Sequence, residues 1–353
     1  MRPDSPLVSV LLPVRNGLPY LPAAIESVLQ QTWRDLELLV IDDGSTDGTT
    51  AYLRTLTDPR VRLLTPPTPG LASALNAGLA AACGRYIARQ DADDWSAADR
   101  IARQVAVLES SPDVDVLATA ASFVDEAGCP VVSDWTETVR TQWDAAVTPA
   151  QIATLMPLTC CLFHATVLAR TAVLREAGGY DQATVPAEDY DLWLRLLPER
   201  RFARLAEALY TVRVHAASSS AVARAAQRAR VIEAKLRYVR RQMPHLPWPA
   251  RLVLPCEDRG AEVFRAVGPG LGFVPVAAPP ETADVVAVTD FAALPAWSAA
   301  LAAPGAFSVF GNVFVRRGLA ACGVSANGDT GARSVPPSRP SRSAVPPSAA
   351  PGA

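Results

Sequence analysis

A cluster of aspartates near residue 90 is the part of the sequence best suited to chemistry. Residues 89–95 read RQDADDW and follow the apolar, β-prone residues 86–88. Side chains two apart in a strand point to the same side, so Asp91 and Asp93 face one cavity if the strand continues through them. Their like charges repel each other, and a bound cation would offset that repulsion. Paired carboxylates suit Mg²⁺ or Mn²⁺, which take oxygen ligands and also bind phosphate.

The same cluster also has a purely structural interpretation. Asp94 or Ser96 could cap the helix expected over residues 97–108, by accepting hydrogen bonds from its first N–H groups. We therefore expect Asp94 to be the cap, which leaves Asp91 and Asp93 available for a ligand.

A second polar cluster, VIDDGSTDGT, spans residues 40–49. Its structural interpretation is a strand-to-helix turn that bends at Gly44 and is capped by Ser45, Thr46 or Asp47. A carboxylate held at that turn could also accept hydrogen bonds from the N–H of a base or from a ribose hydroxyl.

A third acidic group, Glu188 and Asp189, begins the helical pattern AEDYDLWLRLL over residues 187–197. Acids in the first turn of a helix complement its dipole, which is the structural interpretation. The chemical alternative is a general base that takes a proton from a hydroxyl.

The elements that must position these groups alternate between two periods. Apolar strand runs occupy residues 7–14, 36–44, 61–64 and 86–90, and helical patterns occupy residues 21–29, 49–56, 71–82 and 97–108. Such alternation predicts an α/β fold with a parallel sheet, in which ligands bind outside the carboxyl ends of the strands. Residues 13–16, 42–43 and 91–94 all follow such ends, so three polar clusters should meet at one edge.

Composition argues against several kinds of partner and site. The chain has 353 residues, 50% hydrophobic, and a net charge of −2, so nothing in its charge favours a nucleic acid partner. Six cysteines include no CxxC pair, which argues against a zinc site or a disulfide framework. No apolar run approaches the ~18 residues of a membrane span. We expect a cytoplasmic protein, with peripheral contact at the inner face of the membrane left open.

Four motifs together resemble the family 2 glycosyltransferases with the GT-A fold. In chain order they read LLPVRNG, VIDDGSTDGT, GRYIARQDADD and AEDYDLWLR, and the resemblance covers about residues 7–215. It implies transfer of a sugar from a nucleotide-diphosphate sugar to a hydroxyl of a glycan or lipid-linked acceptor, with inversion at the anomeric carbon. It also implies a divalent cation, Mn²⁺ or Mg²⁺, as cofactor.

The resemblance assigns donor-side roles to five residues. Pro13 and Asn16 match the loop against the nucleotide, and Asp43 matches the position that recognises the base. Asp91 matches a ribose or metal-side contact. Asp93 matches the carboxylate that holds the metal on the diphosphate.

On the acceptor side, Asp189 matches the catalytic base, with Glu188 beside it.

On the donor side, Asn76 also matches a phosphate-side segment, in which the family often has an arginine just before the asparagine. Here that residue is Leu75, so the cationic contact is missing or comes from elsewhere, with Arg89 as the candidate.

Two histidines have both functional and structural interpretations. His215 follows a strand-like run and matches a position that can complete the metal site, or it is a hydrogen-bonded surface residue. His164 resembles the acceptor-side histidine of the family, although its apolar surroundings favour a partly buried structural role.

The expected organisation has four parts: a GT-A domain over residues 1–220, a helical extension over 221–248, a small α/β region over 249–323, and a disordered Pro/Ser/Ala-rich tail over 324–353. The glycosyltransferase function has two alternatives. A sugar-nucleotide-binding module without turnover is the first alternative. A nucleotidyltransferase would need a glycine-rich, basic loop after the first strand, which PVRNGLPY does not supply.

Overall fold

The computed structural model describes residues 6–157, 159–216, 218, 224–242, 244, 249–253, 264–266, 268–271, 273–276, 285–287, 307–310 and 313–316. The chain divides into two units, Met1–Arg317 and Gly318–Ala353. The second unit, and with it the tail expected over 324–353, lies outside the described residues.

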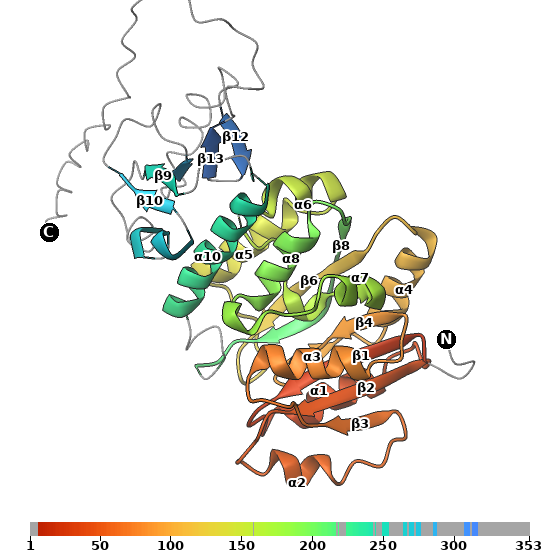
Figure 1. Ribbon diagram of the computed structural model, residues 1–353. Coiled ribbons are helices and arrows are strands. Elements are labelled where there is room, and N and C mark those ends of the chain that lie inside the picture. Colours follow the sequence, from red (N-terminus) through yellow and green to blue (C-terminus); the bar gives the residue numbers. More distant parts are fainter. Residues whose placement is uncertain are drawn as a thin grey trace, which may run out of the picture. The chain divides into compact units, whose positions relative to one another are not determined.

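An eight-stranded mixed sheet forms the centre of the fold, in the order β3-β2-β1-β4-β7-β6-β8-β5 (Figure 1). Strands β1 to β4 pair in parallel, whereas β7 and β5 run antiparallel to their neighbours. The strands are β1 (Val8–Val14), β2 (Leu36–Asp42), β3 (Val61–Leu64), β4 (Tyr86–Arg89), β5 (Trp95–Ser96), β6 (Val116–Val124), β7 (Leu168–Arg170) and β8 (Phe202–Arg213).

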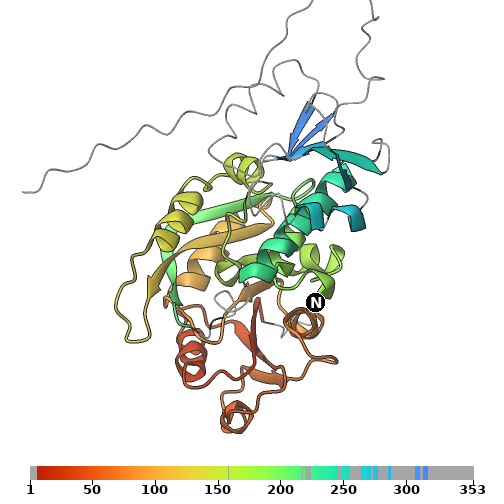
Figure 2. The same ribbon diagram turned by 90° about the vertical axis from the view of Figure 1, so that its left-hand side faces the viewer.

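Helices cover both faces of this sheet (Figures 1 and 2). They are α1 (Leu21–Leu29), α2 (Thr49–Leu53), α3 (Leu71–Ala81), α4 (Arg100–Ser110), α5 (Asp134–Asp144), α6 (Pro149–Leu155), α7 (Thr171–Glu176), α8 (Glu188–Leu196) and α10 (Arg224–Gln242), with 3₁₀ turns η1 (His164–Thr166), η2 (Gln182–Thr184) and η3 (Pro269–Leu271). A five-stranded sheet contains β9 (Ala250–Val253), β10 (Phe273–Pro275), β11 (Val285–Ala287), β12 (Phe307–Phe310) and β13 (Val313–Arg316).

The continuous apolar sequence of β1 reflects burial on both faces. Val10 and Leu12 belong to the hydrophobic cluster that includes α1 and α4, whereas Leu11 belongs to the cluster that includes α3, α7 and α8. Strand β2 divides its side chains between the same two clusters. The expected α/β alternation over the first hundred residues is therefore confirmed, with small shifts at the ends of elements.

One of those shifts overturns the expected helix cap. Helix α4 begins at Arg100 rather than at residue 97, and its N-cap residue Asp99 makes no side-chain capping bond. The N–H of Ile101, in the first turn, donates instead to Gln31 Oε1 at 3.0 Å.

The residues before α4 pair as β5 with β8, which moves Asp94 away from the helix. Its carboxylate instead accepts a hydrogen bond from the backbone N–H of Arg213, at 2.8 Å. The prediction of Asp94 as a cap was wrong, because strand pairing with a distant segment competes with local capping.

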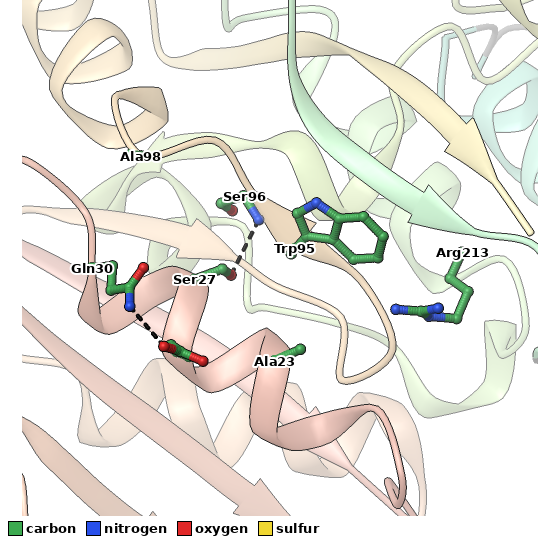
Figure 3. A pocket seen from close by; sticks show the side chains of 8 residues that line it. Ala23, Ser27, Gln30, Trp95, Ser96, Ala98 and Arg213 are labelled. Carbon is green, nitrogen blue, oxygen red and sulfur yellow. Dashed lines mark hydrogen bonds between the residues drawn. The ribbon is translucent and has the colours of Figure 1, made fainter. Parts of the chain in front are cut away.

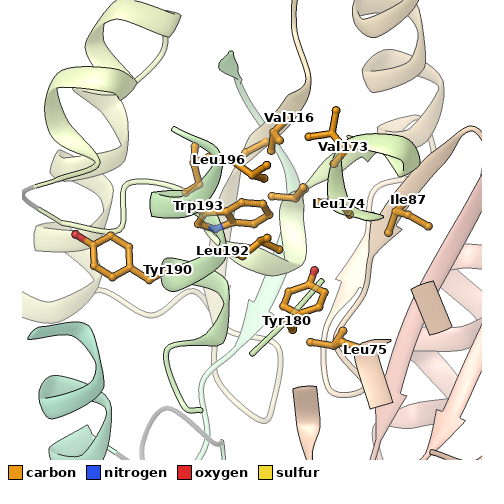
Figure 4. Packing of buried hydrophobic residues seen from close by; sticks show 14 of the residues in the cluster. Leu75, Ile87, Val116, Val173, Leu174, Tyr180, Tyr190, Leu192, Trp193 and Leu196 are labelled. Atoms are coloured by element: carbon orange, nitrogen blue, oxygen red, sulfur yellow. The ribbon is translucent and has the colours of Figure 1, made fainter. Parts of the chain in front are cut away.

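Helix α8 is anchored by Trp193, which is fully buried (Figure 4). Its ring meets Phe202 of β8 edge to face, with ring centroids 5.9 Å apart. Leu75 of α3 is also fully buried in the same cluster. An arginine in place of Leu75 would carry its charge into this core, so the departure from the family pattern is consistent with the local packing.

The turn before β4 presses against β1 at Gly84. The N–H of Gly84 donates to Ser9 Oγ at 2.8 Å, and its carbonyl accepts from Thr171 Oγ1 at 2.7 Å. A Cβ at Gly84 would lie 2.6 Å from the backbone nitrogen of Ser9. Since backbone atoms of a central strand cannot move cheaply, only glycine fits here.

Gly84→Ala should therefore lower the free energy of unfolding by roughly 1–3 kcal/mol, through overpacking against β1. Urea denaturation checks this. Gly128→Ala is the control: open space surrounds its missing Cβ, and only its φ of 84° is unfavourable, so the expected loss is ~1 kcal/mol. Equal losses in the two variants would contradict the close-packing argument.

Candidate functional site

Three loops meet at the carboxyl ends of β1, β2 and β4. In the sheet, Val14 lies opposite Asp42 and Leu11 lies opposite Arg89, so the loops that follow these strands emerge side by side. The polar clusters expected at one edge of the sheet are thus brought together by strand register.

The loop after β1 is bound to the loop after β2 through Asn16. Asn16 adopts a left-handed conformation, with φ 57°. Its side-chain oxygen accepts from the N–H of Thr46 at 2.7 Å, and its own N–H donates to Ser45 Oγ at 2.8 Å. Pro13 is buried inside β1, opposite Ile41. The structure therefore places Asn16 on the exposed edge and Pro13 in the sheet beneath it.

Asp43 stands at the end of β2, where it is 9% exposed. Both of its carboxylate oxygens accept the N–H of Gly70, at 2.9 and 3.0 Å. Gly70 is the residue before α3, and its φ of 123° lies in a region that disfavours side chains. This contact fixes the carboxylate in direction and leaves lone pairs for a further donor.

Gln90 organises the acidic loop after β4. Its side chain is fully buried, and its Nε2 donates to the carbonyls of Asp91 and Asp94 at 3.0 and 3.1 Å. The hydroxyl of Tyr210, on β8, accepts from the N–H of Asp91 at 3.0 Å. Sequence reasoning missed both Gln90 and Tyr210. The available signal was the strand alternation, which points residue 90 away from 89 and 91.

Asp93 pairs with His215, and their Oδ2 and Nε2 atoms lie 2.8 Å apart. The side chain of Asp93 is 33% exposed and that of His215 is 9% exposed. Burial, followed by the charge of Asp91, raises the pKa of Asp93. The imidazole of His215 also lies 5.3 Å from the ring of Tyr20. The structure brings together these two residues, which are 122 positions apart in the sequence.

Arg213 braces this part of the site. Its guanidinium lies 4.5 Å from the ring centroid of Tyr20 and 4.8 Å from that of Trp95. Its Nε donates to the carbonyl of Asp93 at 3.2 Å. Cation–π contacts of this kind stabilise a fixed guanidinium, so the acidic loop is tied to the end of β8.

A pocket of about 470 Å³ lies between α1 and β5 (Figure 3). It is lined by Ala23, Glu26, Ser27, Gln30, Trp95, Ser96, Ala98 and Arg213. None of the predicted donor, metal or base residues lines it, so we do not take it as the reaction site.

The donor set of the acidic loop fits a hard divalent cation. Among the described residues, no three His, Cys, Asp or Glu side chains form a group able to hold a metal ion. Mg²⁺ and Mn²⁺ commonly take only one or two protein ligands and complete their shell with phosphate oxygens and water. Asp93 and His215 satisfy that smaller requirement.

The acidic pair at the start of α8 is held largely out of water. Asp189 Oδ1 accepts the N–H of Tyr190 at 2.7 Å. Glu188 is 5% exposed, and within the described part of the chain its Oε2 has no hydrogen-bond partner. Burial raises the pKa of Asp189 to about 6, and burial together with the charge of Asp189 raises that of Glu188 to about 7. A carboxyl in that range can exchange protons near neutral pH.

Arg89 is a buried cation that contacts the acidic loop and acts on the α8 pair through its charge. Its side chain is 6% exposed, and its NH2 contacts Asp91 Oδ1 at 2.6 Å. Its charge lowers the pKa values of Glu188 and Asp189, against the larger effect of burial. The structure thus supplies a guanidinium in this region although Leu75 does not.

The side-chain amide of Asn76 binds both backbone groups of Tyr180. Its Nδ2 donates to the Tyr180 carbonyl at 2.8 Å, and its Oδ1 accepts the Tyr180 N–H at 2.9 Å. The contact connects α3 to the segment that leads into α8. The structure therefore gives Asn76 a positioning contact in addition to the expected donor-side role.

His164 is half-buried beside Tyr180 and Trp193. Its Nε2 is 2.9 Å from the hydroxyl of Tyr180, and its ring meets Trp193 edge to face at 5.9 Å. Burial, followed by the charge of Arg89, lowers the pKa of His164 well below its ordinary value. His164 is therefore neutral at physiological pH.

The chain is similar to known glycosyltransferases. The profile of the family described as "Glycosyl transferase family 2" matches residues 9–175. The "Putative glycosyltransferase EpsE" of Bacillus subtilis is 36% identical over 218 residues, covering 60% of this chain and 74% of that protein. An "Uncharacterized glycosyltransferase" of Haemophilus influenzae is 30% identical over 223 residues, covering 62% of this chain and 69% of that protein.

Solved structures show a related fold. TarS 1–349 of S. aureus, in complex with UDP-GlcNAc, superposes with a TM-score of 0.53 and 18% identity, covering 74% of this chain and 70% of that one. Across the described residues, none of the helices is both long enough and apolar enough to span a membrane.

Asn76→Ala should lower the free energy of unfolding by about 1–3 kcal/mol, because it leaves the buried backbone groups of Tyr180 without partners. Thermal and urea unfolding check this. The control is Gln182→Ala, whose exposed side chain donates a single bond to Pro69 and whose loss should be small. If Asn76→Ala weakens donor binding without any loss of stability, the contact with Tyr180 is not its main role.

Proposed function

The chain belongs to glycosyl transferase family 2 and has the GT-A fold, and we propose that it transfers a sugar from a nucleotide-diphosphate sugar to an acceptor hydroxyl with inversion. The proposed acceptor is a glycan or a lipid-linked saccharide. The proposed transferase domain covers residues 1–220, with 221–248 as a helical extension and no assigned chemistry for 249–323.

The observation that carries this proposal is the buried Glu188–Asp189 pair close to the acidic loop. Asp91 lies near enough for its charge to raise the pKa values of both carboxyls. A donor whose diphosphate is held at the loop would thus place its sugar close to a carboxyl that titrates near neutral pH. Inverting transfer needs that juxtaposition, since the acceptor oxygen must lose its proton as it attacks from the face opposite the diphosphate.

On the acceptor side, we assign Asp189 as the general base. Its Oδ2 is the oxygen left after Oδ1 accepts the N–H of Tyr190. That oxygen would take the proton of the acceptor hydroxyl while the bond to the anomeric carbon forms. Glu188 and neutral His164 would serve as hydrogen-bonding groups for the acceptor.

On the donor side, Asp43 would recognise the base, with Asn16 and Pro13 forming the loop against the nucleotide. The double contact of Asp43 with Gly70 supports this, because it fixes the carboxylate before a ligand arrives. Asp91 would contact the ribose, and Asn76 would hold the phosphate-side segment in place. The complex of TarS with UDP-GlcNAc is compatible with a nucleotide-sugar donor here.

Asp93 and His215 would hold Mn²⁺ or Mg²⁺ against the diphosphate. When bound, the cation would neutralise charge on the leaving diphosphate as a Lewis acid. The Oδ2 of Asp93 and the Nε2 of His215 lie 2.8 Å apart, which supports their assignment to one cation site.

The alternative is a module that binds sugar nucleotides without turnover. Hydrolysis of the donor in the presence of Mn²⁺ distinguishes the two, because a module without a working base and leaving-group site would release no nucleoside diphosphate. A screen of UDP-, GDP- and dTDP-sugars identifies the donor in the same assay.

Asp189→Asn should reduce kcat by about 10²–10⁴-fold, because an amide cannot accept the proton of the acceptor. Donor Kd should hardly change, since the donor side is intact. The wild-type kcat should also decline as the pH falls through the pKa of Asp189, about 6. Measurements of kcat against pH, with donor Kd by calorimetry, check both. Turnover close to wild type would remove Asp189 from the mechanism.

The same variant has a predicted effect on stability. A carboxyl with a raised folded-state pKa stabilises the protein below its unfolded pKa and loses that contribution as the pH rises through the folded value. For Asp189 the loss falls between about pH 4 and pH 6 to 7. Asp189→Asn should then raise Tm relative to wild type at pH 8, and much less at pH 4. A carboxylate that only stabilised the helix dipole would give a lower Tm at pH 8 instead.

Asp93→Ala should abolish metal-dependent donor binding without unfolding the protein. In wild type, EDTA should weaken donor binding to the level of this variant, and in the variant EDTA should have no further effect. The control is Asp113→Ala, which removes an exposed carboxylate paired with Arg201 and should bind donor normally. Unchanged Mn²⁺-dependent binding in Asp93→Ala would contradict the metal assignment.

A further inference from the structure

Arg89 is a buried cation that the proposed mechanism does not yet use. It is the last residue of β4, and its N–H donates to the carbonyl of Val167 at 3.0 Å. Only 6% of its side chain is exposed. Burying a guanidinium costs several kcal/mol unless charges and hydrogen bonds compensate. The groups that contact Arg89 must therefore offset the cost of its burial.

Those partners lie on the acidic loop. NH2 contacts Asp91 Oδ1 at 2.6 Å, and NH1 donates to the carbonyl of Gln90. One side of the guanidinium thus holds both the carboxylate and the backbone of the loop. Within the described part of the chain, Nε has no hydrogen-bond partner. The loop contacts alone leave this donor unused in the interior.

Arg89 also acts on the acidic pair of α8 through its charge. Its positive charge favours the ionised forms of Glu188 and Asp189, whereas the charge of Asp91 opposes them. Glu188 also has a buried oxygen without a described partner. Arg89 therefore contacts one of three mutually repelling carboxyl groups and is within electrostatic reach of the other two.

Other titratable groups act on Asp189 from the elements around it. They are Glu188 and Tyr190 on α8, Arg89 on β4, Asp91 after β4, Cys160 before η1, and Tyr180 before η2. Tyr180, Tyr190 and Cys160 all have raised pKa values through burial, so they are neutral at physiological pH. Arg89 is the positive member of this set.

We propose that Arg89 is a positioning residue for sugar transfer, which holds Asp91 and the Gln90 carbonyl of the acidic loop on the donor side and supplies a positive charge to the acidic pair of α8 on the acceptor side. This inference rests on the proposed function, because it presumes that Asp189 is the base. It gives the two halves of the site a common charged group. Its two roles are separable, since one needs the planar fork of arginine and the other needs only a positive charge.

Arg89→Gln and Arg89→Lys separate these roles. Arg89→Gln removes a positive charge that favours ionised Asp189, so the pKa of Asp189 should rise. The acid limb of the kcat–pH profile should then move up by ~1 pH unit. Donor Kd should also rise, because Asp91 loses its partner. In Arg89→Lys the acid limb should stay near that of wild type, since the charge is kept. Donor Kd should still rise, because an ammonium cannot hold Asp91 and the Gln90 carbonyl as a fork.

Arg170→Gln is the matched control. Arg170 is a half-buried arginine on β7, the strand that pairs with β4, and its guanidinium donates to the carbonyls of Val114 and Leu108. Its loss should lower Tm without moving the acid limb. A merely structural Arg89 would behave in the same way, and that result would overturn the proposal.

The outcomes also separate this inference from the proposed function. If Asp189→Asn turns over normally, the assignment of the base fails, whatever Arg89 does. If Asp189→Asn is inactive and Arg89→Gln keeps the wild-type acid limb, only the role of Arg89 fails. If Arg89→Gln does not fold, Arg89→Lys decides: an unmoved acid limb with weaker donor binding supports the proposal, and any other combination overturns it.

Discussion

Repulsion among partly buried carboxyl groups is the constraint on which the rest of the site depends. Asp91, Asp93, Glu188 and Asp189 gather at one edge of the sheet, and burial raises the pKa values of the last three. A chain free to relax would move these groups apart. They stay together because each is attached to a strand end or a helix start that the hydrophobic core holds in place. The folding free energy of that core offsets the repulsion among the carboxyl groups.

The supporting contacts are directed at backbone as much as at side chains. Gln90 binds the carbonyls of the acidic loop, Asn76 binds both backbone groups of Tyr180, and Asn16 binds the N–H of Thr46. Such contacts set where a loop runs before any ligand arrives, and preorganisation of this kind reduces the entropy lost on binding. These three side chains can therefore influence donor binding by fixing the positions of the loops that they contact.

Much of the fold was predictable because the first hundred residues have strong local patterns. Apolar runs that alternate with helical periods mark strands buried on both faces, and β1 and β2 show this division directly. Prediction weakened where pairing is non-local. Strand β5 pairs with β8, more than a hundred residues later, and this displaced the start of α4 and gave Asp94 a partner that no local rule identifies.

The sequence by itself determined the acidic motifs, their order and the sheet edge at which they meet, because strand alternation and turn chemistry act over a few residues. Only the tertiary structure decided that His215 reaches Asp93, that Arg89 contacts Asp91 and acts on Asp189 through its charge, and that the amide of Asn76 is engaged by Tyr180. Those contacts join residues from separate elements. Their distances depend on strand register and helix packing, and their energies depend on burial, which no local stretch of sequence specifies.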